Sequence, residues 1–150
     1  MTDRQSLERA LATRMSPVSR AWQRLADTTL ASLGISSSTG WALVYLQRLG
    51  DSARQADLAR AVGVTEASLV RTLHALEDAG LVVRAVDKRD RRANLLQLTP
   101  EGVSHASRID RRLAALRSEL LDGVSDGELE TTLRVLDTLA AKLADRRAQP

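Results

Sequence analysis

The residues with the clearest capacity for chemistry are basic and lie close together, between positions 84 and 92. This stretch holds five basic and two acidic residues, a local excess of +3 that equals the formal net charge of the whole chain. Arginine guanidinium groups pair with phosphate oxygens and with the acceptor atoms of guanine. The usual meaning of such a run is a solvated loop, so a role in nucleic-acid binding depends on the elements beside it. The charged residues are Arg84, Asp87, Lys88, Arg89, Asp90, Arg91 and Arg92.

Residues for other kinds of chemistry are scarce. The chain contains no cysteine, which excludes disulfides, thiolate catalysis, cysteine-ligated zinc and thiol-based redox sensing. His74 and His105 are isolated, no glycine-rich phosphate loop follows a predicted strand, and no nucleophile lies in a recognisable catalytic motif. We therefore expect no catalytic residue, no cofactor and no metal, and an enzyme is the least supported class of function.

An amphipathic helix precedes the basic stretch. Thr65 can cap its first free amides, and Ala79-Gly80 ends it, because glycine accepts the left-handed conformation of a closing turn. Arg71 and His74 project away from the apolar face of this helix. That face follows the three-four spacing of a buried stripe, with apolar residues at Leu69, Leu73 and Leu76.

A second helix and two short strands complete a winged helix-turn-helix. The segments Leu81–Val86 and Leu95–Leu98 are branched and apolar enough to form a hairpin whose loop carries the arginines. Before the amphipathic helix, a short helix with Leu58 and Val62 inward is followed by a glycine turn, which is the spacing of a helix-turn-helix. The predicted DNA-binding domain covers residues 36–99.

Further helices flank this domain. In the N-terminal segment Ser16-Pro17 interrupts the apolar pattern, so either a new helix begins at the proline or one long helix bends there. A helix from Gly40 to Leu49 follows, with candidate caps between Ser36 and Thr39. After the hairpin, Thr99-Pro100-Glu101 starts a helix, and Ser125 to Glu128 forms a capping box for the last one.

The flanking regions, residues 1–35 and 100–150, carry more amphipathic helix than a compact winged domain needs to cover itself. We expect them to pair with the same helices of a second copy, which makes the protein a homodimer. The alternative is that they pack on their own winged domain. The candidate dimerisation residues, which in the last helix follow the rhythm of a coiled-coil seam, are Leu7, Leu11, Leu129, Leu133, Leu136 and Leu143.

Composition agrees with a mainly α fold that carries a small β wing. The 43% of hydrophobic residues are mostly leucine, alanine and valine, and the aromatic residues are only Trp22, Trp41 and Tyr45, which favours helices over a β sandwich. No apolar run is long enough to cross a membrane and nothing resembles a signal peptide, so we expect a cytoplasmic protein. A net charge of +3 on 150 residues suggests a polyanionic partner only weakly, because solubility alone accounts for so mild an excess.

Short sequence motifs lie in the amphipathic helix, in the hairpin loop and directly after the hairpin. Asp87, Arg89 and Arg92 fill the pattern D-x-R-x-x-R in the wing, and Leu98-Thr99-Pro100-Glu101-Gly102 follows. Together with the order of the helices, these motifs resemble the multiple antibiotic resistance regulator (MarR) family over nearly the whole chain. The segments Ser68 to Leu73 and Leu76 to Leu81 are similar to its SlyA-like branch. The wing pattern is moderately specific alone and strong when such a helix precedes it at this distance.

The resemblance implies a homodimeric transcription factor that binds pseudo-palindromic double-stranded DNA and is often released by a small aromatic or phenolic anion. With the helix in the major groove, Arg71 is the predicted base-contacting residue, because arginine pairs with both acceptors of guanine. Ser68 matches a family position that touches bases or phosphate. Thr65 and His74 are candidates for phosphate contacts, and His74 is equally well explained as a solvated residue.

The wing arginines are assigned to the neighbouring minor groove, where the negative potential favours arginine. Arg89, Arg91 and Arg92 cannot all be the inserted residue. By the family pattern, Asp87 or Asp90 pairs with one arginine and stiffens the loop, which frees another for the groove. We predict Arg91 in the groove and Arg92 as the ion-pair partner.

In the family, the effector pocket lies where the winged domain meets the dimerisation helices. The candidate pocket residues here are Arg14, Trp22, Trp41 and Tyr45. The alternative is that the three aromatic residues belong to the core or to the dimer interface, with their polar groups hydrogen-bonded locally.

Two other functions fit a winged helix with a basic wing. One is a module for protein contacts, and the other is a DNA-compacting protein without operator specificity. Specific binding to one DNA sequence distinguishes the regulator from both, because a compactor binds all sequences uniformly and an interaction module binds none.

Overall fold

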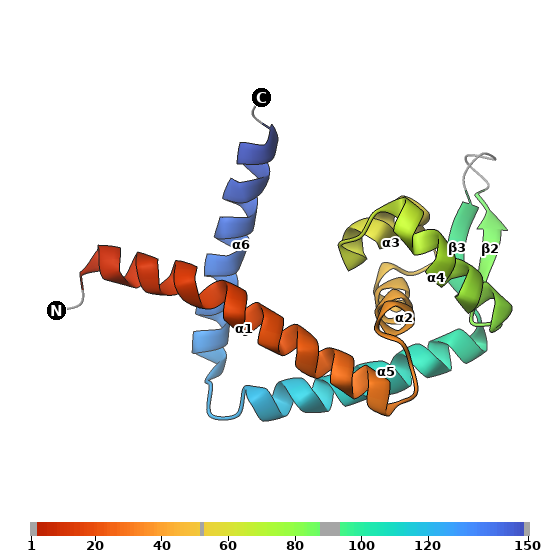
Figure 1. Ribbon diagram of the computed structural model, residues 1–150, viewed down its shortest axis with the longest axis horizontal. Helices are drawn as coiled ribbons and strands as arrows, with labels where there is room; N and C mark the ends of the chain where they lie inside the picture. The colour runs from red at the N-terminus through yellow and green to blue at the C-terminus, as the bar shows by residue number, and fades with distance from the viewer. Residues whose placement is uncertain (1–2, 52, 88–93, 149–150) are drawn as a thin grey trace. The chain divides into compact units, whose positions relative to one another are not determined.

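Helices and a small antiparallel sheet make up the described residues, which are 3–51, 53–87 and 94–148 of the computed structural model. The mainly α fold with a small β wing that the sequence predicts is confirmed. Two units, Met1–Leu116 and Arg117–Pro150, divide the chain within α5. In chain order the elements are α1 (Arg4–Ser32), α2 (Ser37–Leu49), β1 (Ala53–Arg54), α3 (Gln55–Val62), α4 (Glu66–Asp78), β2 (Val82–Val86), β3 (Asn94–Leu98), α5 (Pro100–Leu120) and α6 (Asp126–Ala148) (Figure 1).

The first helix, α1, runs without interruption through Pro17. The alternative in which a new helix begins at this proline is therefore wrong. A proline inside a helix removes one backbone hydrogen bond and costs about 3 kcal/mol. In a helix of 29 residues the hydrogen bonds on both sides outweigh that local loss, because helix propagation is cooperative.

The second helix, α2, begins at Ser37 rather than at Gly40, because the Ser36 side chain caps it by accepting the N–H of Thr39 at 3.3 Å. Val44 and Leu46 are buried. Gly40 faces α1, where a Cβ would lie 2.8 Å from a methyl carbon of Leu30. The glycine thus lets α1 and α2 approach closely.

The sheet has three strands in the order β1-β3-β2, all antiparallel to their neighbours. The hairpin of β2 and β3 is confirmed, with Arg84 opposite Leu96. The strand β1 was not predicted, because Ala53 and Arg54 form a strand of only two residues, which is too short for any periodic pattern. This strand pairs with β3 and places Arg54 opposite Leu95.

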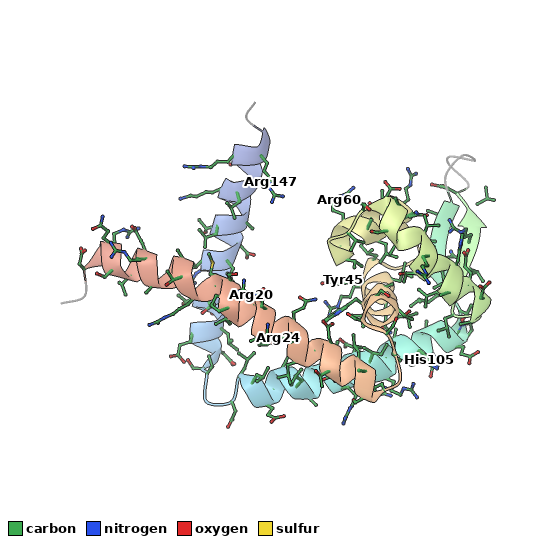
Figure 2. All side chains as sticks on the ribbon, in the orientation of Figure 1. Arg20, Arg24, Tyr45, Arg60, His105 and Arg147 are labelled. Atoms are coloured by element: carbon green, nitrogen blue, oxygen red, sulfur yellow. The ribbon has the colours of Figure 1, made fainter. Side chains whose placement is uncertain are left out.

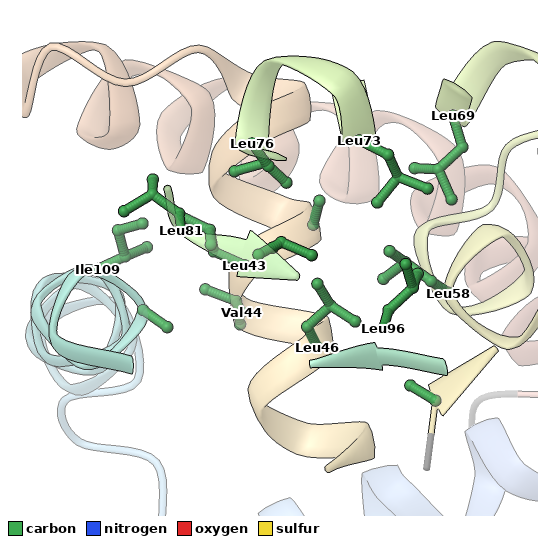
Figure 3. Packing of buried hydrophobic residues seen from close by; sticks show 14 of the residues in the cluster. Leu43, Val44, Leu46, Leu58, Leu69, Leu73, Leu76, Leu81, Leu96 and Ile109 are labelled. Atoms are coloured by element: carbon green, nitrogen blue, oxygen red, sulfur yellow. The ribbon is translucent and has the colours of Figure 1, made fainter. Parts of the chain in front are cut away.

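The hydrophobic core lies in the first unit, between the C-terminal end of α1, α2, the helix-turn-helix, the sheet and the middle of α5. Figure 3 shows leucine and isoleucine side chains from these elements converging on Leu43 of α2. The buried stripe predicted for α4 is confirmed, and Leu58 of α3 is also buried. The largest side chains with less than 2% exposure are Leu30, Leu43, Leu46, Leu58, Leu73, Leu76, Leu96 and Ile109.

Both C-terminal helices start as their cap residues predict. The Thr99 hydroxyl accepts the N–H of Gly102 at 3.0 Å and donates to the carbonyl of Gly80 at 2.7 Å, which joins α5 to the end of α4. In the second unit, Glu128 accepts the backbone N–H of Ser125 at 2.9 Å and the Ser125 hydroxyl accepts the N–H of Glu128 at 3.4 Å, which are the two reciprocal bonds of a capping box. Within the described residues, no helix combines the length and apolar character needed to cross a membrane.

Candidate nucleic-acid interface

The exposed side of α4 presents the residues predicted to contact DNA. Leu69, Leu73 and Leu76 are buried against the core, and this fixes the rotation of the helix. Arg71 and His74 are consequently exposed. The helix therefore offers a guanidinium group and an imidazole on a face that the rest of the winged domain leaves open.

The first turn of α4 is organised by Thr65 and Ser68. The Thr65 hydroxyl accepts the N–H of Ser68 at 3.2 Å, and the Ser68 hydroxyl donates to the carbonyl of Thr65 at 2.9 Å. Both residues are exposed. The two hydroxyls thus act as a helix cap in the free protein, and each O–H already has an acceptor, Ser68 Oγ for Thr65 and the Thr65 carbonyl for Ser68. To donate to a phosphate oxygen, either hydroxyl must turn away from that acceptor.

Arg60 is an exposed basic residue that was not among the predicted DNA contacts. It projects from α3, the first helix of the helix-turn-helix (Figure 2), and lies 3.5 Å from Asp57 with 78% of its side chain exposed. In this motif the first helix crosses the DNA backbone. Its outward position was available from the sequence, because Leu58 and Val62 define the inward face of the same helix.

The wing is tied to β1 by an ion pair at its base. The Arg54 guanidinium donates to an Asp87 carboxylate oxygen at 2.9 Å, and Asp87 is 8% exposed. We predicted that either Asp87 or Asp90 pairs with an arginine of the wing loop, whereas Arg54 lies outside that loop, on β1. Because β1 was missed, nothing in the sequence pointed to Arg54.

A second ion pair ties the wing to α4. Arg84 Nε donates to Glu77 Oε1 at 2.7 Å, and Arg84 Nη1 lies 3.5 Å from the side-chain oxygen of Gln55. Arg84 belongs to the basic stretch, and its charge is offset by Glu77. This arginine therefore adds little net positive charge to the predicted DNA-binding surface.

The remaining predictions for the wing fall on residues outside the described ranges. They concern the groove-entering arginines and the second candidate acid, namely Arg89, Asp90, Arg91 and Arg92.

Two of the four predicted effector residues lie together on α2. The rings of Trp41 and Tyr45 are 6.0 Å apart and tilted by 37°. The indole N–H of Trp41 donates to Asp27 of α1 at 3.1 Å, so its polar group is hydrogen-bonded locally. Arg14 and Trp22 lie on the exposed surface of α1.

A cavity of about 390 Å³ lies between α2 and α5. Arg48 extends along its wall, 3.5 Å from Asp110 and 5.6 Å from the centre of the Tyr45 ring. The four predicted effector residues do not line this cavity. Its lining residues are Val44, Gln47, Arg48, Ser107, Asp110 and Arg111.

Comparison with known proteins agrees with the winged fold. The model of the MarR family matches residues 33–93. The transcriptional regulator PA3341 is 35% identical over 90% of this chain and 98% of that chain, with a TM-score of 0.83. A mutant of S. aureus MepR bound to an oligodeoxyribonucleotide is 25% identical, with coverages of 89% and 97% and a TM-score of 0.57.

A third structure supports the fold alone. CouR from Rhodococcus jostii RHA1, bound to p-coumaroyl-CoA, is 24% identical over 91% of this chain and 95% of that chain, with a TM-score of 0.78. The helix-turn-helix, its wing, the family match and the 35% identity to a regulator over nearly its full length lead to one conclusion. The chain belongs to the MarR family of transcriptional regulators.

Proposed function

We propose that this protein is a homodimeric regulator of the SlyA-like branch that binds a pseudo-palindromic operator and is released from it by a small aromatic anion. The observation that carries the proposal is the orientation of α4. Its leucines are buried and Arg71 is exposed, which is the arrangement that a helix needs to enter the major groove.

In the proposed complex, α4 contacts bases through Arg71 and Ser68. A guanidinium pairs with guanine O6 and N7, and the adjacent hydroxyl reaches a base edge or a phosphate. Thr65 and His74 contact phosphates, which position the helix without specifying a sequence. Arg60 on α3 adds a phosphate contact from the first helix of the motif.

The wing serves the minor groove beside this major-groove site. Arg91 enters the groove, and Arg89 and Arg92 contribute positive charge or pair with the acids of the wing. Arginine is favoured there by the negative potential of a narrow minor groove. The wing base, held to β1 and α4 through Asp87 and Arg84, supports this role because it limits where the loop leaves the sheet.

Dimerisation accounts for the apolar stripe of α1. In the isolated chain its buried residues are Ala26 and Leu30, near its C-terminal end. The exposed positions recur every three or four residues, as in a helix that packs against a partner. They are Leu7, Leu11, Met15, Val18, Trp22 and Leu25.

Taken by itself, α6 also carries exposed apolar side chains at helical spacing. Leu133, Leu136 and Leu143 are 59%, 45% and 61% exposed. Large apolar side chains at regular helical spacing are seldom left in water along a whole helix. A second copy of the chain is the simplest partner for both stripes.

The proposed effector is a small aromatic carboxylate in the cavity between α2 and α5. A volume of about 390 Å³ suits a small organic molecule. Arg48 and Arg111 supply positive charge, which the Asp110 carboxylate, 3.5 Å from Arg48, offsets in part. CouR, a protein of the same fold, is bound to p-coumaroyl-CoA in its crystal structure.

Selection of DNA from a randomised duplex library tests the proposal. The regulator enriches one pseudo-palindromic sequence, and gel shifts with the enriched and scrambled duplexes differ by at least about a thousandfold in affinity. Uniform binding to both duplexes would identify a compactor, and no binding would identify a protein-interaction module.

A further inference from the structure

Two arginines hold the base of the wing, at β2 and Asp87, from opposite faces of the sheet. Side chains directly opposite each other in antiparallel strands share a face, and successive residues alternate. Arg84 is level with the buried Leu96, which places it on the core face. Arg54 is level with Leu95 and Ala85, so it shares the outer face with Asp87, two residues beyond Ala85.

On the core face, Arg84 links the wing to both ends of α4. Its Nε donates to Glu77 in the last turn of the helix at 2.7 Å. Its Nη1 lies 3.5 Å from the side-chain oxygen of Gln55, and the Gln55 amide donates to the carbonyl of Glu66, the first residue of α4, at 3.2 Å. A single side chain of β2 is therefore connected to the first and the last turn of the helix.

On the outer face, Arg54 spans the sheet. It lies on β1, and Asp87 follows the end of β2, with β3 between the two strands. Strands two apart are separated by roughly 10 Å, so the extended arginine crosses the central strand. The Arg54 backbone N–H also donates to Asp57 of α3 at 3.1 Å, which fixes the residue at the start of the helix-turn-helix.

The exposure of Arg84 and Glu77 indicates how much their ion pair contributes to folding stability. The side chains of Arg84 and Glu77 are 30% and 26% exposed, and partly exposed ion pairs contribute little to folding stability. Arg84 directs donors toward Glu77 and Gln55 on the core face of the sheet. These facts fit an Arg84 that orients the wing relative to α4 better than an Arg84 that stabilises the fold or contacts DNA directly.

We propose that Arg84 is a positioning residue that sets the angle between α4 and the wing, with Arg54 as its counterpart on the outer face. The inference rests on the proposed function, since the angle matters only if α4 and the wing occupy neighbouring grooves of one DNA duplex. A helix and a wing that are held rigidly can enter both grooves without a further ordering cost at the time of binding.

Three variants of the full-length protein test this role. They are Arg84→Gln, Glu77→Gln, and the exchange of the pair by Arg84→Glu with Glu77→Arg, which keeps the net charge. The probe is the duplex that the wild type enriches from a randomised library. Affinity is measured over a range of salt concentrations. Dimethyl sulfate then reports protection of guanine N7 in the major groove, and hydroxyl radicals report protection along the minor groove.

The positioning role predicts that Arg84→Gln and Glu77→Gln both weaken binding by about tenfold, comparable with the loss of one groove contact. Minor-groove protection at the wing is lost while guanine N7 protection by α4 remains. The exchanged pair regains affinity to within about threefold of wild type. Arg4→Gln, which removes a paired arginine from α1, is the matched control and leaves binding unchanged.

A direct electrostatic role for Arg84 predicts the opposite sign for Glu77→Gln, because removing a carboxylate near DNA strengthens binding. Tighter binding by that variant, or no rescue by the exchange, would overturn the inference, as would unchanged footprints in both single variants. If a core-face variant fails to give the wild-type circular dichroism spectrum, Arg54→Gln on the outer face must show the same wing-specific loss. A wild type that enriches no duplex would instead refute the proposed function and this inference with it.

Discussion

The α-carbon of Gly102, in the first turn of α5, lies against the carbonyl oxygen of Leu81 at the start of the wing. A Cβ at position 102 would be 2.0 Å from that oxygen. The same carbonyl accepts the N–H of Thr99 at 3.0 Å, so it cannot turn away without losing a hydrogen bond. The contact joins the start of the wing to α5 at a point that leaves no space for a Cβ.

Gly102→Ala is expected to destabilise the protein by about 3 kcal/mol, because overpacking against a fixed backbone atom outweighs the higher helix propensity of alanine. Urea denaturation followed by circular dichroism measures the effect. Gly127→Ala is the control, since a Cβ there meets no atom within 4 Å and should be neutral or slightly stabilising. Equal stability of wild type and Gly102→Ala would show that α5 can shift away from the wing.

Arg71→Ala is expected to cost about 1–3 kcal/mol in affinity for the enriched duplex and to relax the preference at one base pair. The reason is that Arg71 is exposed on the face of α4 that we propose enters the major groove. Arg60→Ala should weaken binding evenly on all sequences and lower the salt dependence, as for a phosphate contact. Binding to single-base variants of the duplex separates the two patterns. Uniform losses from Arg71→Ala would exclude base contact.

A charge placed in an apolar stripe should dissociate the dimer. Leu11→Glu in α1 and Leu136→Glu in α6 each bury an unpaired carboxylate in the proposed interface, which costs several kcal/mol. Sedimentation velocity should then report monomers for both variants and a dimer for wild type. Val83→Glu is the control, because Val83 is an equally exposed apolar residue, at 46%, that belongs to β2. A wild type that sediments as a monomer contradicts the prediction.

The capping box of α6 should make folding depend on pH. Hydrogen bonds from the hydroxyl and the backbone N–H of Ser125 lower the pKa of Glu128 below its ordinary value. A lowered folded-state pKa means that the stabilising contribution is present above the unfolded pKa, about 4.3, and is lost as pH falls through the lower folded value.

Glu128→Gln should therefore be less stable than wild type at pH 7, and the difference between them should shrink as pH falls below about 4. Thermal unfolding of both proteins between pH 7 and pH 3 measures this. Ser125→Ala should behave similarly, because it removes the hydroxyl that holds the carboxylate. A difference that stays constant over this range would mean that the carboxylate is not the stabilising group.

Arg48→Ala should abolish the response to an aromatic acid and leave DNA binding intact, because Arg48 provides charge at the cavity between α2 and α5. A panel of hydroxybenzoates and hydroxycinnamates is titrated into the complex with the enriched duplex, and release is followed by fluorescence anisotropy. Arg14→Ala on α1 is compared under the same conditions. Loss of the response in Arg14→Ala alone would move the site to the surface of α1.

Local patterns in the sequence were sufficient to predict most of the helices and the hairpin. The leucines of α4, the Thr65 cap and the capping box of Ser125 and Glu128 act within one or two helical turns, so their spacing alone determines where helices begin and which side is buried. The hairpin and the helix-turn-helix followed from short apolar runs and glycine turns. The same patterns placed Arg71 and His74 on the open side of α4.

Tertiary structure alone decided the contacts between distant residues. Pro17 was ambiguous because its local cost is small beside the cooperativity of a long helix. The strand at Ala53-Arg54 exists only because β3 pairs with it, and without that strand neither the Arg54–Asp87 pair nor the two-sided support of the wing could be foreseen. Arg84 looked like a member of the basic stretch, and only the register of β2 directs it toward Glu77. Such pairings depend on the register of strands and on the packing of helices, which no pattern within one segment contains.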